Sequence, residues 1–515
     1  MKLNYKKTIY VGLAFMLISL FWQTYDAVIS RIIVDKFGLN YSQAGYVMAI
    51  DNVLALFLLP LFGGLSDKTN HKKGKRTPYI VVGTVLAAFL FVGLSFADNI
   101  QLKKLEVETN LYEKHEVIEG FSADTPVESW EALYNETLLE GKDLSNLKDL
   151  IDDPDNTTVL TLENYYNARD IYYAYLSSIA FEVTMNSPFV FIVFMGMLFL
   201  TLLAMSTFRS PAVSLMPDVT TKQLRSKANA VINLMGAVGG ISAIIMLKLF
   251  GLDKHSMVNY APAFIFVSIV MIITLGVFLW KVNEPKLVSE RLQLEKNYDV
   301  KDEEEVISHD VLDKAKRRSL FLILISVFLW FMGYNAVTTY LSNYAPKILQ
   351  MGYSTPLLIA QATAIVGFIP IGILSLRIGR KKTILFGVLL LMISFGYVYF
   401  LKPETSMLLY VVLGLTGIAW ASINVNSYPM VVELSKGSDV GKYTGYYYTF
   451  SMAAQILTPI LAGWLMTNSF LKTRVLFPYA AFFVSIAFIT MLFVKHGDAK
   501  PEKKSLLENF DVDMD

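Results

Sequence analysis

Long apolar runs alternate with short polar loops along most of the chain. Twelve of these runs are close to 20 residues long, which is the length that an α-helix needs to cross the hydrocarbon core of a membrane. The pattern predicts an all-α membrane protein, because a helix satisfies its own backbone hydrogen bonds in lipid. The predicted spans are residues 8–32, 42–65, 78–97, 187–207, 228–250, 260–281, 319–341, 355–377, 383–401, 406–426, 443–467 and 474–495.

Composition and the N-terminal sequence agree with this interpretation. The chain of 515 residues is 54% hydrophobic and only 17% charged, whereas about 25% of residues are charged in a soluble protein. The first apolar run is too long for the core of a signal peptide and no small-residue cleavage site follows it, so we expect a retained first span. Cysteine is absent, which excludes disulfides and thiolate chemistry.

The loop between the second and third runs, within residues 63–83, orients the chain. It carries five Lys and Arg residues and one acid, Asp67. Short basic loops of this kind stay on the cytoplasmic side of a membrane. Residues 98–170, on the opposite side, carry 18 acidic and 6 basic residues. With an even number of spans, the sequence predicts a multi-pass protein of the plasma membrane with both termini in the cytoplasm.

An internal repeat divides the chain into two halves. The sequence GLSDKTNHKKGKRTP after the second run has a counterpart, GILSLRIGRKKT, after the eighth, and Asp218 to Lys227 has the spacing of Glu433 to Lys442. Such a repeat predicts two six-helix halves related by an axis normal to the membrane. The first pair of motifs lies 309 residues apart and the second pair 215, so the first half contains 94 additional residues.

These observations predict the domain organisation. The expected units are an N-terminal half (1–97 and 187–281), an acidic extracellular insert (98–186), a cytoplasmic linker (282–318), a C-terminal half (319–495) and a cytoplasmic tail (496–515). Within the insert, Thr125-Pro126-Val127-Glu128 has the pattern of a capping box with proline at the first helical position. We therefore expect a small helical cap on the outer face, between the third and fourth spans.

The hairpin motif resembles the signature loop of the major facilitator superfamily. Its particular form is similar to that of the glycoside–pentoside–hexuronide:cation symporters and the sucrose–proton symporters. Related motifs occur at residues 21–26, 50–80, 209–219 and 427–446. The resemblance implies transport by alternating access around a site near the middle of the membrane. The chain has Ala55 and Leu59 where the melibiose permease branch has two carboxylates, which favours the sucrose–proton side.

Two acidic residues stand inside predicted spans, Asp26 in the first and Asp51 in the second. Because these spans are antiparallel, the two carboxylates should lie at similar depth. Ionisable groups within a membrane are costly and mark ion pathways, and two adjacent carboxylates in a low dielectric favour retention of a proton. We expect them to couple transport to H⁺, with Na⁺ as the alternative and no other cofactor. In the structural alternative, Asp26 pairs with Arg31 and Asp51 is a hydrogen-bond acceptor.

Amide and aromatic side chains within the spans supply what a sugar needs, namely hydrogen bonds and a flat apolar face. Amides in hydrocarbon face the interior of a helix bundle, although each of them can also serve only to join two helices. The candidate substrate-binding residues are Trp22, Gln23, Tyr25, Asn52, Asn233, Trp330, Tyr334, Asn335, Gln361, Trp420 and Asn424.

Charged residues at the hairpins form a separate group, which we expect to act as a cytoplasmic gate. A basic hairpin with one acid can form ion pairs in one conformation and break them in another, provided that the pairs are partly buried. The gate candidates are Asp67, Lys75, Arg76, Asp218, Arg380 and Glu433.

Other classes of protein lack their characteristic residues. All five histidines lie in loops or tails, and the chain contains neither a P-loop nor a GxSxG sequence. We therefore expect no metal site and no enzyme. The sequence predicts a cation-coupled symporter of a disaccharide, oligosaccharide or glycoside, which works as a monomer in lipid and has no nucleic-acid partner. A proton-driven exporter of drugs or lipids and a transporter-like membrane sensor are the alternatives.

Overall fold

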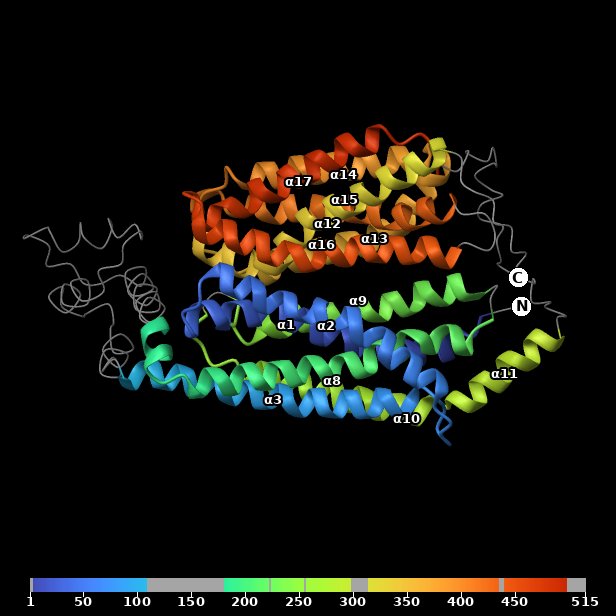
Figure 1. The fold of residues 1–515 in the computed structure, drawn as a ribbon, viewed down its shortest axis with the longest axis horizontal. Helices are drawn as coiled ribbons and strands as arrows, with labels where there is room; N and C mark the ends of the chain where they lie inside the picture. The colour runs from blue at the N-terminus through green and yellow to red at the C-terminus, as the bar shows by residue number, and fades with distance from the viewer. Residues whose placement is uncertain are drawn as a thin grey trace, which may run out of the picture.

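The computed structural model describes residues 3–108, 180–221, 224–253, 256–297, 314–434 and 440–497. Within these ranges, twelve long helices run roughly parallel or antiparallel to one another (Figure 1). They are α1 (Tyr5–Arg31), α2 (Tyr41–Lys68), α3 (Thr77–Glu108), α8 (Phe189–Val219), α9 (Arg225–Leu249), α10 (Ala261–Lys281), α12 (Lys314–Leu349), α13 (Ser354–Ile378), α14 (Arg380–Val398), α15 (Leu408–Val432), α16 (Val440–Asn468) and α17 (Leu476–Leu492).

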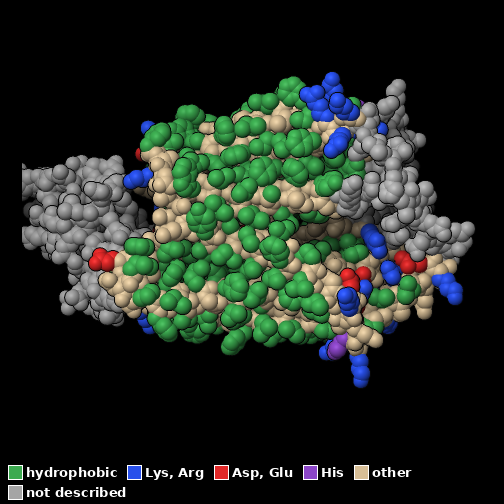
Figure 2. All heavy atoms as spheres, in the orientation of Figure 1, with side chains coloured by type: hydrophobic (Ala, Val, Ile, Leu, Met, Phe, Trp, Pro, Cys, Tyr) green, Lys and Arg blue, Asp and Glu red, His purple; other side chains and the backbone are tan. Residues whose placement is uncertain are grey.

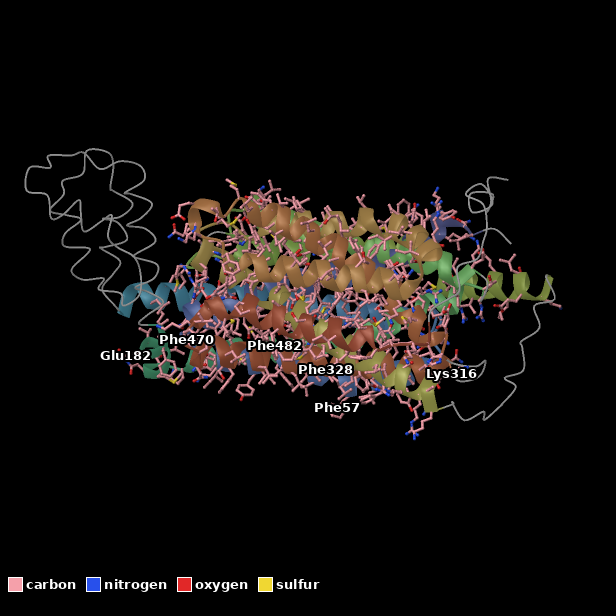
Figure 3. The ribbon with its side chains drawn as sticks, turned by 90° about the horizontal axis from the view of Figure 1, so that it is seen from above. Phe57, Glu182, Lys316, Phe328, Phe470 and Phe482 are labelled. Carbon is pink, nitrogen blue, oxygen red and sulfur yellow. The ribbon has the colours of Figure 1, made fainter. Side chains whose placement is uncertain are left out.

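The apolar runs of the sequence account for these helices. Eleven of the described helical stretches are long and apolar enough to cross a membrane, and the twelfth, α13, contains a shorter apolar stretch at Ser354–Phe368. Apolar side chains cover the flank of both halves (Figure 2). Several large aromatic residues, such as Phe57 and Phe482, point away from the bundle (Figure 3). The predicted membrane-spanning, all-α architecture is confirmed.

The helices form two six-helix halves. In the first half α1 packs along α9 and α3 along α8, while in the second half α13 and α14 pack along α15. Figure 1 shows α12–α17 as one layer and α1–α10 as the other. The halves meet mainly where α2 lies against α16, with further contacts between α9 and α13 and between α1 and α12. Any site between the halves is therefore bounded by these helices.

The two ends of the bundle differ, and we name them by their connections. The hairpin end contains residues 69–76, between α2 and α3, and α1 begins and α17 ends at the same end (Figure 1). The insert end is where α3 reaches Glu108 and where the described residues resume with helical residues 180–186. Residues 109–179, with the capping box expected at 125–128, lie outside the described residues.

Several boundaries differ from those expected. Helix α3 continues to Glu108, so residues 98–108 extend the third helix instead of beginning the insert. The linker contains a helix that the sequence analysis did not anticipate, α11 (Glu284–Asn297), whose mixed charge hid it from a search for apolar runs. At the insert end, α1 continues as a π-helix, η1 (Ile32–Lys36).

A tight connection joins η1 to α2. Gly38 adopts a φ of +72°, and a Cβ at this position would lie 2.0 Å from the backbone nitrogen of Phe181, so glycine is required both for the turn and for the close approach. Asn40 and Gln43 then form a capping box that begins α2. The insert end of α1 is thereby fixed against the helix at residues 180–186.

Candidate functional site

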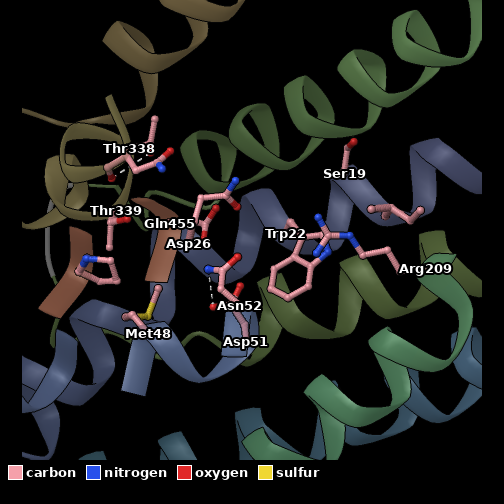
Figure 4. Close-up of a pocket in the computed structure, with 13 residues that line it drawn as sticks. Ser19, Trp22, Asp26, Met48, Asp51, Asn52, Arg209, Thr338, Thr339 and Gln455 are labelled. Atoms are coloured by element: carbon pink, nitrogen blue, oxygen red, sulfur yellow. Dashed lines mark hydrogen bonds between the residues drawn. The ribbon is translucent and has the colours of Figure 1, made fainter. Parts of the chain in front are cut away.

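A cavity of about 300 Å³ lies between the two halves (Figure 4). Its walls come from α1, α2 and α8 in the first half and from α12 and α16 in the second. Three charged side chains line it, those of Asp26, Asp51 and Arg209. Its uncharged polar lining consists of Ser19, Asn52, Asn335, Thr338, Thr339 and Gln455. The cavity is therefore polar and is shared by both halves of the repeat.

The structure brings Asp26 and Asp51 to one cavity, as the antiparallel arrangement of the first two spans predicted. Asn52 donates a hydrogen bond of 2.8 Å from its Nδ2 to Oδ1 of Asp51. The guanidinium of Arg209 lies 5.3 Å from the centroid of the Trp22 ring, within the range of a cation–π contact. When both carboxylates are ionised, the cavity holds two negative charges and one positive charge.

The expected structural alternative for Asp26 is not found. Arg31 donates from its guanidinium to the carbonyl oxygen of Leu252 at 2.9 Å, and lies over the ring of Tyr353. Asp26 instead faces the cavity with Trp22, one helical turn earlier on α1. The polar stripe of α1 thus faces the second half.

Only some of the proposed sugar-binding residues line this cavity. Trp22, Asn52 and Asn335 do so. Gln23 and Gln361 form a hydrogen bond of 2.5 Å to each other, which joins α1 to α13 across the two halves. Both amides are thus engaged with one another in this conformation, a helix-joining role that the sequence analysis had weighed beside substrate binding.

The other candidates lie apart from the cavity. Tyr334 stacks on Trp420 with ring centroids 3.6 Å apart, whereas Asn233 and Asn424 occupy exposed positions on α9 and α15. Trp330 is fully buried in the core.

Tyr25 is also buried, and its ring stacks on that of Phe21. Tyr25 and Trp330 fill space between helices, so a direct contact with substrate is not supported in this conformation.

Arg209 is the main site residue that the sequence analysis missed. The predicted fourth span ended at residue 207, which placed Arg209 in a basic loop at the membrane surface. The structure continues α8 to Val219, through Pro211 and Pro217, and so places Arg209 on the wall of the cavity. Pro211 and Pro217 both lie inside this helix. They are tolerated within membrane helices, where neighbouring groups satisfy the freed backbone carbonyls.

The gate candidates form two separate clusters at the hairpin end. Arg76 pairs with Asp67 and, from its Nε at 2.7 Å, with Asp218, while Lys75 lies 3.4 Å from Asp218. In the second half Arg380 pairs with Glu433. The repeat thus predicted residues that do form ion pairs, each pair within its own half.

Glu284, at the start of α11, is a further partner of the hairpin. Its carboxylate is buried and accepts hydrogen bonds from the backbone nitrogens of Lys75, Arg76 and Thr77, at 2.8 to 3.1 Å, and from the Thr77 hydroxyl. An anion at this position satisfies the free N–H groups that begin α3 and opposes the helix dipole. Gly74 leaves the space, because a Cβ there would lie 2.2 Å from the Glu284 carboxyl carbon.

Comparison with known proteins shows which family this chain resembles. Residues 173–369 and 357–511 match the Major Facilitator Superfamily, and residues 9–103 match the family described as MFS/sugar transport protein. An uncharacterized MFS-type transporter of Methanocaldococcus jannaschii is 30% identical over 127 residues, which is 24% of this chain and 30% of that protein. The chain thus aligns with less than a third of that relative's length.

Solved structures show the same fold over nearly the whole chain. The inward-open xylose transporter XylE of E. coli is 14% identical with a TM-score of 0.57, over 96% of this chain and 97% of XylE. A mutant of the nucleoside transporter NupG is 13% identical, with the same TM-score, over 96% of this chain and all of NupG. A bacterial homologue of the iron transporter ferroportin is 10% identical with a TM-score of 0.56, over 95% and 99%. The chain belongs to the Major Facilitator Superfamily, whose members are transporters and not enzymes.

Proposed function

We propose that this protein is a secondary active transporter that couples the movement of a disaccharide, oligosaccharide or glycoside to H⁺. The observation that carries the proposal is the cavity between the halves, in which Asp26, Asp51 and Arg209 face hydroxyl and amide groups of both halves. Hydroxyls and amides match the hydrogen-bonding groups of a sugar, and a site shared by the halves is accessible from alternate sides when the halves rock.

The charge of the cavity favours a proton over a sodium ion. Arg209 already places one cation beside Asp26 and Asp51, and this charge weakens the attraction of the two carboxylates for a second cation of fixed charge. A proton instead neutralises one carboxylate and leaves the guanidinium with a single counter-ion. Protonation of Asp26 or Asp51 would then weaken the electrostatic attraction between the carboxylates and Arg209. We propose that this change is the coupling step.

The lining of the cavity also favours a sugar over an apolar drug or lipid as the substrate. A site for drugs or lipids is expected to be largely apolar. Here Asn52, Asn335 and Gln455 contribute amides, and Thr338 and Thr339 contribute hydroxyls. The match of residues 9–103 to the MFS/sugar transport family supports the same choice.

We also propose that the hairpin end is cytoplasmic and that the protein acts in the plasma membrane as a monomer. The basic residues of the hairpin support this orientation. This orientation would place both chain termini and α11 in the cytoplasm and the end of α3 at Glu108 outside the cell.

Uptake by proteoliposomes tests the proposal. With an inward pH gradient, purified protein should accumulate a labelled disaccharide, and dissipation of the gradient should abolish accumulation. Asp51→Asn should abolish gradient-driven uptake but retain exchange of labelled for unlabelled sugar, because exchange needs no net proton movement. Glu404→Gln, which neutralises an exposed acid outside the cavity, is the matched control. Uptake that ignores the pH gradient would disprove proton coupling, and failure with every sugar tested would disprove the substrate class.

A further inference from the structure

The two halves are joined at the insert end by a buried ion pair. Nζ of Lys347, on α12, lies 2.5 Å from Oδ1 of Asp35, on η1. The Asp35 side chain is 2% exposed, whereas that of Lys347 is 38% exposed. An ion pair removed from water on one side is sensitive to any separation of its partners, because each lone charge must then be rehydrated or paired again.

Two further polar contacts cross the halves beside this pair. Arg31, from the first half, lies 5.3 Å from the ring centroid of Tyr353, in the second half. This distance is within the range of a cation–π contact. On the same face of α1, Ser30 donates a hydrogen bond of 3.0 Å to Oδ1 of Asn343. All these side chains are buried except Lys347.

The π-helix η1 is what places Asp35 on this face. Trp22, Asp26 and Ser30 follow one another at intervals of four residues on the side of α1 that faces the second half. The next interval is five residues, to Asp35, and the hydrogen bond from the nitrogen of Phe37 to the oxygen of Ile32 has the i to i+5 spacing of a π-turn. One polar stripe therefore connects the cavity to the ion pair.

The helix backbones also approach closely at this end. A Cβ at Gly45 of α2 would lie 2.2 Å from the carbonyl oxygen of Pro459 in α16, and a Cβ at Gly463 would lie 2.2 Å from that of Tyr41. The backbone nitrogen of Ser42 donates to the Thr467 hydroxyl at 2.9 Å. The contact between the halves at the insert end is thus close in backbone as well as in side chains.

The hairpin end is built differently. The ion pairs of the gate candidates join residues of the same half, as with Arg76 and Asp218 or Arg380 and Glu433. Figure 2 shows the surface hollowed between the halves towards this end. The surface between the halves is thus hollowed towards the hairpin end, whereas the halves are in close contact at the insert end.

We infer that the Asp35–Lys347 ion pair, with the contact of Arg31 on Tyr353, is the latch that holds the insert end closed, and that it must separate before the cavity can open there. Separation leaves neither charge stranded. Lys347 is already partly in water, and Asp35 lies one turn from Arg31 on its own helix, where the two can pair. This inference rests on alternating access alone and requires neither the proposed sugar nor the proposed ion.

Thiol labelling tests the latch, because the natural chain contains no cysteine. Thr339→Cys places a single thiol on the cavity wall. A membrane-impermeant maleimide is then applied from the side of the membrane at which the insert end lies. Labelling of a separate Lys103→Cys variant, whose thiol is exposed at the insert end, identifies that side. Asp35→Asn and Lys347→Gln should each speed labelling at least about fivefold, the lower range of conformational couplings. Glu404→Gln and Lys402→Gln, exposed at the same end, should not change the rate.

The double variant decides whether the two residues act together. If they form one latch, Asp35→Asn with Lys347→Gln should label no faster than either single variant, because the second substitution removes nothing further. Rates equal to those of the controls, or effects of the two substitutions that multiply, would overturn the inference.

A cross-link provides a measurement that needs no transport or cavity label. The hydrogen bond between Ser42 and Thr467 keeps their backbones within reach of a disulfide. Ser42→Cys/Thr467→Cys should cross-link rapidly under mild oxidation, and adding Lys347→Gln should slow the reaction several-fold. Lys347 is partly exposed, so this substitution is tolerated even if Asp35→Asn prevents folding. An unchanged cross-linking rate would overturn the latch.

Discussion

Both ends of this protein contain clusters of acidic and basic residues, but the clusters join different parts of the molecule. At the hairpin end, Arg76 connects Asp67 and Asp218 within the first half. At the insert end, Asp35 of the first half is paired with Lys347 of the second. Contacts within a half move with that half as a unit, whereas contacts across the halves must break when they rock.

The charged residues of the two ends therefore affect different properties, namely stability at the hairpin end and the equilibrium between conformations at the insert end. Residues expected to gate the hairpin end keep their partners within one half here, so in this conformation they stabilise the helix connections. Asp35 and Lys347, at the opposite end, form an ion pair that crosses the halves. A charged motif therefore indicates its role only when its partner is known to lie in the same or the other half.

The largest expected effect comes from a buried pair within one half. Nζ of Lys36 lies 2.6 Å from Oδ1 of Asp98, and both side chains are fully buried. Lys36→Met leaves the Asp98 carboxylate without its ion-pair partner, so the free energy of unfolding should fall by about 3–5 kcal/mol. Thermal unfolding in detergent measures the change.

A double variant sharpens this prediction. Lys36→Met with Asp98→Leu removes both charges and should recover much of the lost stability. Its cavity labelling from the insert-end side should stay slow, since this pair does not cross the halves. If the Lys36→Met variant is as stable as the wild type, the prediction that this buried ion pair stabilises the first half is wrong.

A smaller effect is expected from Glu284 at the hairpin end. Glu284→Ala removes the carboxylate that caps α3, and the loss of a cap lowers stability by about 1–2 kcal/mol. The matched control is Glu290→Ala, on the same helix, which loses a partly exposed ion pair with Lys7 and should change stability by less than about 1 kcal/mol. Equal shifts in the melting temperatures of both variants would argue against the cap.

The smallest effect on stability is expected from Asp67→Asn. The Asp67 side chain is 58% exposed, and Arg76 retains Asp218 when it loses Asp67, so stability should change by less than about 1 kcal/mol. A gate role for Asp67 predicts that the rate of transport falls while substrate affinity stays nearly unchanged, whereas a pair that only stabilises the first half predicts an unchanged rate. The test measures both the substrate affinity, by titration of binding, and the initial rate of uptake. A large loss of affinity would show that Asp67 belongs to the binding site.

The spans and the two halves were predictable from sequence because membrane insertion depends on local hydropathy. The pairing of Asp26 with Asp51 in one cavity followed from the antiparallel order of two adjacent spans. Arg209 escaped prediction because a basic residue beside an apolar run is typical of a membrane surface. Only the continuation of α8 beyond Pro217 shows that it lies within the bundle.

The sequence by itself determined that twelve apolar helices form two related halves, which basic loops stand at the hairpin end, and which few polar residues enter the membrane. The tertiary structure alone decided which of these polar residues meet. It separated Trp330 and Tyr25 from the cavity, brought Arg209 into it, and paired Asp35 with Lys347, 312 residues away. Hydropathy is a property of a single segment, whereas these contacts depend on how the faces of distant helices, and one π-turn in η1, are oriented towards each other.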